Sequence, residues 1–267
     1  MFRTSIRRVH RALGRRKLET FALALTAAVS AIGFVRRDAG GSIAPLASVA
    51  SAVSTPVAAF LTPTEPRAAT TASARATKAN LATLSHPLVD SWIKRFTTDQ
   101  RGSFVTYLSR MTKYEDMITS KLAAKGMPQE LIYLAMIESG FNPTVSSPVK
   151  ARGLWQFMSP TAKQYGLTVN RKVDERVNPA RATDAAVKYL SSLYDRLGSW
   201  YLAAAAYNSG EGTVLRALKK TTGKTRGTDA DYFRISPNLP KETRDYVPKL
   251  IAASRIGSNP GRYGFAD

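Results

Sequence analysis

The chain has 267 residues, 44% of them hydrophobic, which is enough to bury the core of at least one domain. Its 39 lysines and arginines against 19 acidic residues give a formal net charge of +20, which favours anionic partners such as nucleic acids, acidic lipids or cell-wall polymers. The absence of cysteine excludes disulfides, cysteine-ligated metals and thiol nucleophiles, and the presence of only two histidines excludes a multi-histidine metal site. We therefore expect neither a metal nor a cofactor.

The first 37 residues have the layout of a signal peptide or a membrane anchor. Seven basic residues precede an uncharged, mostly apolar run from Thr20 to Val35, and Arg36 and Arg37 follow it directly. The run is short for a membrane span, which needs roughly 20 apolar residues. Cleavage of a signal and retention of an anchor are equally compatible with this pattern. Because the basic residues come before the apolar run, the rest of the chain is predicted to be exported.

Residues 38–85 predict a disordered or semi-extended linker, because 31 of these 48 residues are Ala, Ser, Thr or Pro and no apolar period persists. The composition then changes to that of a folded domain, predicted over residues 86–267. This region holds 27 basic and 16 acidic residues, a difference of +11. His86, beside Pro87 at the edge of the linker, is expected to be a surface residue rather than a catalytic base.

Helical periodicity dominates the predicted domain, and few segments alternate as strands do. The predicted helices cover residues 88–96, 99–112, 114–125, 129–139, 159–165, 180–197, 199–208, 209–220 and 241–256. The longest helix has clear end signals, with Asn178 as its cap, Pro179 in its first turn and Gly198 after its last residue. Residues 221–240 show no clear period and predict a long functional or mobile loop. The fold class is therefore all-α.

The segment "LAMIESGFNP", residues 134–143, places one carboxylate at the end of an apolar helical stripe. Glu138 continues the i, i+3, i+4 pattern of Leu131, Leu134 and Ala135, so it is expected to face the core. Partial desolvation raises the pKa of a carboxyl and suits it to act as a general acid near neutral pH. Gly140 is expected to end the helix beside it. The alternative is a glutamate whose head group simply reaches water from a helix end.

Other polar and aromatic residues recur in short blocks after Glu138. Ser147 follows it, and "ARGLWQFMSPTA" contains Gln156 between two aromatic residues, Trp155 and Phe157, which are either core residues or platforms for sugar rings. "AAAAYNSGEG" places Tyr207 and Asn208 at a helix end, and "LPKETRDYVPKL" places Tyr246 on an amphipathic helix.

These blocks carry a family resemblance. The region from about Met127 to Phe265 resembles the catalytic domain of soluble lytic transglycosylases, which has a goose-type-lysozyme-like fold, and it is most similar to the membrane-bound lytic murein transglycosylase D branch. The matching segments, in family order and spacing, are "ESGFNP", "GLWQFM", "DERVNPARATDAAVKYL", "AAYNSGEG" and "LPKETRDYVPKL". Lys150 departs from the pattern, because many members have Gly or Asn there.

The resemblance implies a role for each matching residue. Glu138 corresponds to the single catalytic acid, and Ser147 to a serine that supports the N-acetyl group of the substrate. Tyr246 corresponds to a tyrosine near the acid. The remaining matches are cleft residues: Gln156, Met158, Tyr207 and Asn208. No second carboxylate is expected to take part, and we assign the nearby acids to helix caps or the surface: Asp174, Glu175, Glu211, Glu242 and Asp245.

The resemblance therefore implies a peptidoglycan lytic transglycosylase in the periplasm or cell envelope, acting as a monomer on glycan strands. An uncleaved N-terminal segment would tether it to the membrane. The alternatives are a lysozyme-like hydrolase and a non-catalytic peptidoglycan-binding protein. Nucleic acid is not expected as a partner despite a pI near 10.4, because no nucleic-acid-binding motif is present and an export signal would be out of place.

Overall fold

The computed structural model describes residues 81–82 and 84–265. The predicted signal or anchor, residues 1–37, and nearly all of the predicted linker lie outside the described residues. Among the residues that are described, no helix is both long and apolar enough to cross a membrane.

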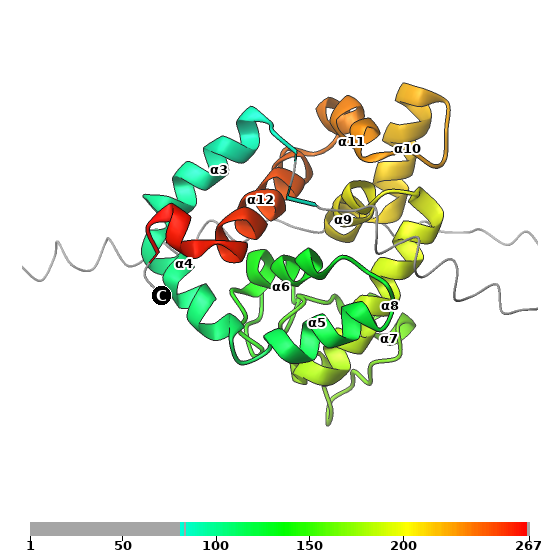
Figure 1. Ribbon diagram of the computed structural model, residues 1–267. Coiled ribbons are helices and arrows are strands. Elements are labelled where there is room, and N and C mark those ends of the chain that lie inside the picture. Colours follow the sequence, from blue (N-terminus) through cyan, green and yellow to red (C-terminus); the bar gives the residue numbers. More distant parts are fainter. Residues whose placement is uncertain (1–80, 83, 266–267) are drawn as a thin grey trace, which may run out of the picture.

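The described part of the chain is helical, and the all-α class is confirmed (Figure 1). With the labels of Figure 1, its α-helices are α3 (Pro87–Thr97), α4 (Arg101–Met111), α5 (Glu115–Ala123), α6 (Ile132–Ser139), α7 (Ser159–Gln164), α8 (Pro179–Leu197), α9 (Trp200–Ser209), α10 (Glu211–Thr222), α11 (Asp229–Ile235) and α12 (Lys241–Ser258). Short 3₁₀ helices are η1 (Gln129–Leu131), η2 (Glu175–Val177), η3 (Ser236–Asn238) and η4 (Pro260–Tyr263). Within this part of the chain, β pairing is limited to isolated bridges such as Ser146 with Arg152.

The predicted ends of the longest helix are confirmed. The Asn178 side chain accepts a hydrogen bond from the Arg181 N–H at 3.1 Å, which satisfies a free donor in the first turn of α8. Gly198 ends α8 in the left-handed conformation, with φ at 81°. Ser199 immediately caps the next helix, α9, by accepting from the Leu202 N–H at 3.2 Å. This tight corner turns the chain back against α8.

The expectation of a long loop over residues 221–240 is wrong, because this stretch contains α11 and η3. A capping box starts α11: the Asp231 carboxylate accepts from the N–H of Thr228 at 2.9 Å and from its hydroxyl at 3.0 Å. Tyr232 and Ile235 are fully buried. The helix has seven residues, which is too short for an apolar period to stand out from its flanks.

The helix predicted over residues 129–139 begins with the 3₁₀ turn η1 and continues as α6. Five consecutive residues of α6, Ile132 to Met136, are buried, so this helix is covered on all sides rather than on one stripe. It lies in the middle of the fold between α5 and α12 (Figure 1). The residues of the expected apolar stripe, Leu131, Leu134 and Ala135, are buried as predicted, and the buried surface extends beyond that stripe. Helix α9 is a second central helix, buried from Trp200 to Ala206.

The residues just before α3 already pack on this core. Leu81 is buried, and its carbonyl accepts from the Tyr201 hydroxyl at 2.9 Å. Arg255 on α12 donates to the carbonyl of Ala82 at 2.7 Å. His86 is half-buried and caps α3, because its Nδ1 accepts from the Leu88 N–H at 3.2 Å. A helix cap is thus a better description of His86 than an idle surface residue.

Candidate active site

Glu138 lies in the last turn of α6, and Gly140 ends the helix directly after it. Gly140 adopts φ of +56°, and its N–H donates to the Met136 carbonyl at 2.9 Å. A Cβ atom added to Gly140 would lie 2.2 Å from Cε1 of Tyr107, so any other residue would have to displace this ring and adopt the left-handed conformation. The predicted glycine stop is confirmed, and it places the Glu138 carboxyl where regular helix gives way to a loop.

The Glu138 carboxylate is held by Tyr246 of α12, whose hydroxyl donates to Oε1 at 2.6 Å. Burial raises the pKa of Glu138 to about 7, although the Tyr246 hydrogen bond and the nearby Lys249 charge lower it and the Glu242 charge raises it. Burial also raises the pKa of Tyr246 well above its usual value, so the phenol stays protonated and remains the donor. Glu138 can therefore both hold and release a proton near neutral pH.

Two charged residues of α12 next to Glu138 were missed as site residues from the sequence. Lys249 Nζ donates to the Ile137 carbonyl at 3.3 Å, one residue before Glu138, and burial lowers the pKa of Lys249. Burial raises the pKa of Glu242, which was assigned to a cap or surface role. Glu242 precedes Tyr246 by four residues and Lys249 follows it by three, so all three lie on one face of α12; this spacing is the signal that could have identified them.

The end of α9 joins α12 to the loop over residues 145–158. The Tyr207 hydroxyl donates to the Trp155 carbonyl at 2.7 Å. Asn208 accepts from the Thr243 hydroxyl at 2.8 Å and donates to a Glu242 carboxylate oxygen at 3.3 Å. Tyr207 therefore ties the end of α9 to the loop, and Asn208 ties it to α12.

The loop over residues 145–158 carries the other predicted site residues. The Ser147 hydroxyl oxygen accepts from the Ala151 N–H at 3.0 Å. Gln156 adopts φ of +46° and donates its amide hydrogens to the carbonyls of Val145 at 3.3 Å and Gly153 at 2.9 Å. Ser147, Gln156 and Met158 are all partly exposed. The recorded hydrogen bonds of Ser147 and Gln156 go to the backbone of their own loop, whereas Tyr246 bonds to Glu138 directly.

The loop is anchored to α6 and to a buried ion pair. Ser139 donates to the Leu154 carbonyl at 2.8 Å, next to Glu138 in sequence. The Arg176 guanidinium donates to Asp174 through Nε at 2.9 Å and Nη2 at 2.8 Å. Its Nη1 donates to the carbonyls of Lys150 at 2.8 Å and Phe157 at 3.0 Å. These bonds from Arg176 lower the pKa of Asp174 to about 2. Asp174 is thus a structural carboxylate, which extends its predicted role as a cap.

Lys150 adopts φ of +65°, a left-handed conformation that Gly and Asn tolerate better than Lys. This explains physically why a family pattern would favour Gly or Asn there. The loop keeps its shape with lysine, because the Lys150 N–H donates to the Ser147 carbonyl at 2.8 Å and its own carbonyl is held by Arg176.

The aromatic residues that flank Gln156 are core residues. Trp155 is fully buried, with its indole N–H donating to Thr183 at 3.0 Å, and Phe157 is 3% exposed. The alternative interpretation of these rings as sugar platforms is therefore wrong. A row of partly exposed tyrosines lies alongside: the ring centroids are 4.7 Å apart for Tyr165 and Tyr189, and 5.2 Å apart for Tyr189 and Tyr207. The sequence gives no sign that these rings from α8, α9 and the end of α7 meet.

Among the described residues, no group of three or more His, Asp or Glu side chains is arranged to hold a metal ion. The site is thus a partly buried proton-binding carboxylate, with Tyr246 bonded to it and the loop over residues 145–158 held beside the end of its helix.

Part of the described region is similar to a known family. Residues 116–229 match the family model described as "Transglycosylase SLT domain", and the matched residues include Glu138, the loop over residues 145–158 and the Tyr207-Asn208 pair. Tyr246 and Lys249 lie beyond the matched residues.

Known proteins are similar to part of this chain. The chain is 40% identical over 158 residues to membrane-bound lytic murein transglycosylase D of Escherichia coli strain K12, covering 58% of this chain and 34% of that protein. It is 32% identical over 146 residues to the soluble lytic murein transglycosylase of Salmonella typhimurium, covering 52% of this chain and 22% of that protein. The chain thus spans about a third or less of the length of these relatives. The structure of the 70 kDa soluble lytic transglycosylase from Escherichia coli superimposes with a TM-score of 0.44 at 26% identity, over 58% of this chain and 25% of that one.

Proposed function

We propose that this chain is a peptidoglycan lytic transglycosylase that cleaves the β-1,4 bond between N-acetylmuramic acid and N-acetylglucosamine. The observation that carries the proposal is Glu138, a carboxyl with a pKa raised to about 7 and oriented by Tyr246, within a domain that matches the SLT family. A group with this pKa is protonated often enough at neutral pH to act as an acid and is basic enough to act afterwards as a base.

In the proposed reaction, protonated Glu138 gives its proton to the glycosidic oxygen as the bond to C1 breaks. The N-acetyl oxygen of the muramic acid stabilises the cationic C1. Glu138, now ionised, removes the proton from the C6 hydroxyl of the same sugar, and that oxygen bonds to C1 to form the 1,6-anhydro product. Water is not consumed, and the intramolecular attack benefits from a high effective concentration.

The hydrogen bonds of the site support this sequence of steps. Tyr246 donates to Glu138 and Lys249 lies nearby, so the ionised carboxylate formed in the first step is stabilised. The Ser147 oxygen already accepts from the Ala151 N–H, so its hydroxyl hydrogen is suited to donate to the acetamido group of the substrate. Gln156 uses its NH₂ group within the loop, which makes its carbonyl oxygen the atom suited to accept from a sugar hydroxyl. Met158, Tyr207 and Asn208 complete the proposed cleft.

We propose the cell envelope as the location of the enzyme, because the substrate lies there and the N-terminal segment predicts export. The predicted organisation into a signal or anchor, a linker and a catalytic domain remains part of this proposal, as do attachment to the membrane through an uncleaved segment and a monomeric state.

Mass spectrometry of digested sacculi tests the reaction. We expect product ends that lack one water relative to hydrolysed ends, and Glu138→Gln should abolish their formation while the variant still binds peptidoglycan. Products with only reducing ends would contradict the proposal and favour a lysozyme-like hydrolase. Binding without cleavage by the unaltered chain would favour a non-catalytic wall-binding protein.

One observation favours the hydrolase as a second candidate. Glu242 lies close enough to raise the pKa of Glu138, and glycosidases that hydrolyse their substrates usually use paired carboxylates. Glu242 is held by Asn208, so we expect it to support the cleft rather than to react. Glu242→Gln should therefore still yield anhydro products. Complete loss of activity in this variant, together with hydrolysed products from the unaltered chain, would support the paired-carboxylate mechanism.

A further inference from the structure

Lys249 of α12 is held beside the candidate active site by two contacts. Its Nζ donates to the Ile137 carbonyl at 3.3 Å, in the last turn of α6. The same Nζ lies 5.5 Å from the ring centroid of Trp92 in α3, within the range of a cation–π interaction. Lys249 is half-buried, and none of the ion pairs within residues 81–82 and 84–265 joins it to Glu138. The ammonium therefore lies near the carboxyl without pairing with it.

The position of this charge matters for a carboxyl that must exchange a proton. The free carbonyls at the end of α6 give the helix terminus a partial negative charge, which opposes an ionised Glu138 and attracts a cation. Burial raises the pKa of Glu138, and the Lys249 charge partly offsets this effect. Direct hydrogen-bonded pairing would keep the carboxyl ionised, as it does at Asp174. At its observed place, Lys249 favours the ionised form of Glu138 while the resting carboxyl can still bind a proton.

The Trp92 ring is itself seated on buried aromatic side chains. Its centroid lies 5.6 Å from that of Phe96, which lies 4.9 Å from that of Phe104 in α4. Phe96 and Phe104 are both buried. The Arg95 guanidinium also lies over the Trp92 ring, at 5.1 Å, but Arg95 is exposed. Trp92 thus offers Lys249 a supported aromatic face at the inner side of α3.

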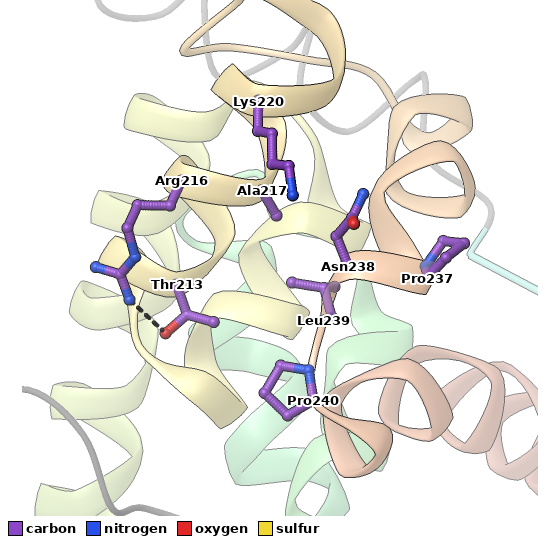
Figure 2. Close-up of a pocket in the computed structure, with 8 residues that line it drawn as sticks. All are labelled: Thr213, Arg216, Ala217, Lys220, Pro237, Asn238, Leu239 and Pro240. Carbon is purple, nitrogen blue, oxygen red and sulfur yellow. Dashed lines mark hydrogen bonds between the residues drawn. The ribbon is translucent and has the colours of Figure 1, made fainter.

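Helix α12 is fixed by its neighbours, so the place of the ammonium depends on the Lys249 side chain. Leu239, just before α12, is buried and points toward Ala217 of α10 (Figure 2). Helix α3 packs alongside α12 (Figure 1), and Arg255 near the end of α12 donates to the Ala82 carbonyl at 2.7 Å. The four-carbon stem of a lysine is flexible, so a partner is needed to keep its charge in one place.

The other titratable groups around Glu138 leave Lys249 as the cation that acts on it. Burial and the Glu242 charge raise the pKa of Glu138, whereas the Tyr246 hydrogen bond and the Lys249 charge lower it. Burial raises the pKa of Tyr207 on α9, so this phenol stays neutral. The charged residues of the neighbouring helices α3 and α5 are exposed or paired with another residue: Asp90, Lys94, Arg95, Glu115, Asp116 and Lys121.

We propose that Trp92 is a positioning residue of the active site, whose ring holds the Lys249 ammonium beside Glu138. Helix α3 then takes part in catalysis, although it lies before the residues matched by the family model. Trp92 acts through Lys249 and does not touch the reacting atoms. The effect on catalysis rests on the proposed function, whereas the placing of the charge rests on the contacts alone.

NMR titration of the Glu138 carboxyl in the full chain tests the placing of the charge without substrate. Trp92→Leu removes the aromatic face and Lys249→Met removes the charge, and each should raise the pKa of Glu138 by about half a pH unit or more. Trp92→Phe and Lys249→Arg keep an aromatic face and a stacking cation, so each should stay close to the unaltered chain. Thermal unfolding checks that each variant is folded, and Trp92→Met replaces Trp92→Leu where the latter does not fold.

Two controls separate this role from general packing and from general charge. Val89→Ala removes a buried contact of the same helix as Trp92, and Lys241→Met removes an exposed charge from the same helix as Lys249. Both should leave the pKa of Glu138 unchanged. A shift in Val89→Ala as large as that in Trp92→Leu would overturn the proposal, because Trp92 would then act by packing alone.

A double-mutant cycle tests whether Trp92 acts through Lys249. Trp92→Leu/Lys249→Met should raise the pKa of Glu138 no further than Lys249→Met does, because the ring has no ammonium left to hold. Additive shifts of the two substitutions would show that Trp92 acts on Glu138 by another route and would overturn the proposal.

Turnover separates this proposal from the proposed function. The alkaline limb of kcat/KM for release of anhydro products should move upward in Trp92→Leu and Lys249→Met, with little change in KM, because neither residue touches substrate. A shifted pKa with an unmoved limb would overturn the catalytic role of Trp92. Anhydro products from the unaltered chain, with no pKa shift in Trp92→Leu, would refute this role and leave the proposed function intact. The expected pKa shifts without anhydro products from the unaltered chain would refute the proposed function and leave the placing of Lys249 intact.

Discussion

Glu138 and Asp174 are both carboxylates near the same loop, but their surroundings act on them in opposite directions. Glu138 receives one hydroxyl hydrogen bond and is partly desolvated, and its pKa rises to about 7. Asp174 is clasped by the Arg176 guanidinium and also accepts from Arg152 at 3.0 Å, and its pKa falls to about 2. The fold thus keeps one carboxyl able to exchange a proton and keeps the other permanently charged as an anchor.

The largest expected effect is on catalysis by Glu138. Glu138→Gln should lower kcat by about 10³-fold or more, since the proton donor and acceptor of both steps is lost. Release of anhydro products measures this effect, and thermal unfolding checks that the fold persists. Asp174→Asn, which removes a carboxylate that we assign only to structure, is the matched comparison: its activity should fall only in proportion to the folded fraction. Retained activity in Glu138→Gln would remove Glu138 from the acid role.

The next effect is on stability at Asp174. Asp174→Asn leaves the guanidinium of Arg176, whose side chain is 8% exposed, without its anionic partner, and we expect a loss of about 2–4 kcal/mol in unfolding free energy. Because the pKa of Asp174 is lowered, its contribution is present above about pH 4 and is lost as the pH falls toward 2.

Chemical denaturation at pH 7 measures the loss at Asp174. The control is Asp184→Asn, which removes a partly exposed pair with Lys121 and should cost less than about 1 kcal/mol. Equal effects of the two substitutions would show that the Asp174–Arg176 pair contributes no more to stability than a partly exposed ion pair.

Removing the Glu138 charge should stabilise the protein in alkaline solution. The folded state has the higher pKa, so the unaltered protein loses stability as the pH rises from about 4.5 through 7, while the glutamine variant does not. We expect the free energy of unfolding of Glu138→Gln to exceed that of the unaltered protein by about 1–3 kcal/mol at pH 8 and to equal it at pH 4. Denaturation series at both pH values measure this. A difference in unfolding free energy that is larger at pH 4 than at pH 8 would contradict the assignment of a desolvated, proton-binding carboxyl.

Tyr246→Phe should change the pH profile of activity. The Tyr246 hydrogen bond lowers the pKa of Glu138, so its loss should move the alkaline limb of kcat/KM, expected near pH 7, upward by about one pH unit. A structural role alone would lower the rate and leave the limb in place. The control is Tyr133→Phe, another buried tyrosine between α6 and α12, whose hydroxyl lies 3.5 Å from that of Ser258 instead of at Glu138; it should leave the limb unchanged.

The smallest effect is expected at Lys150. Asn adopts the left-handed conformation of this residue more readily than Lys, so Lys150→Asn should stabilise the protein by about 0.5 kcal/mol without changing the product. Denaturation at pH 7 measures the difference. Destabilisation would indicate that the lysine side chain itself supports the loop.

Sequence patterns were informative where the physical cause is local. The caps of α8, the glycine stop after Glu138 and most helix positions depend on neighbours within a few residues, and the structure confirms them. Sequence patterns failed where the segment was too short to show a period, or where the cause lay in a distant part of the chain. Helix α11 is too short to show a period, and the burial of Trp155 depends on Thr183 of α8.

The same distinction holds within the candidate site. The sequence by itself determined the helical class, the position of Glu138 at a helix end and the glycine that exposes its carboxyl to a loop, because helix periodicity and backbone conformation are properties of short segments. Only the tertiary structure decided that Tyr246 bonds to Glu138 and that Lys249 and Glu242 lie close to it. Desolvation and charge pairing depend on which distant segments meet, and they set the pKa of the carboxyl on which the proposed chemistry rests.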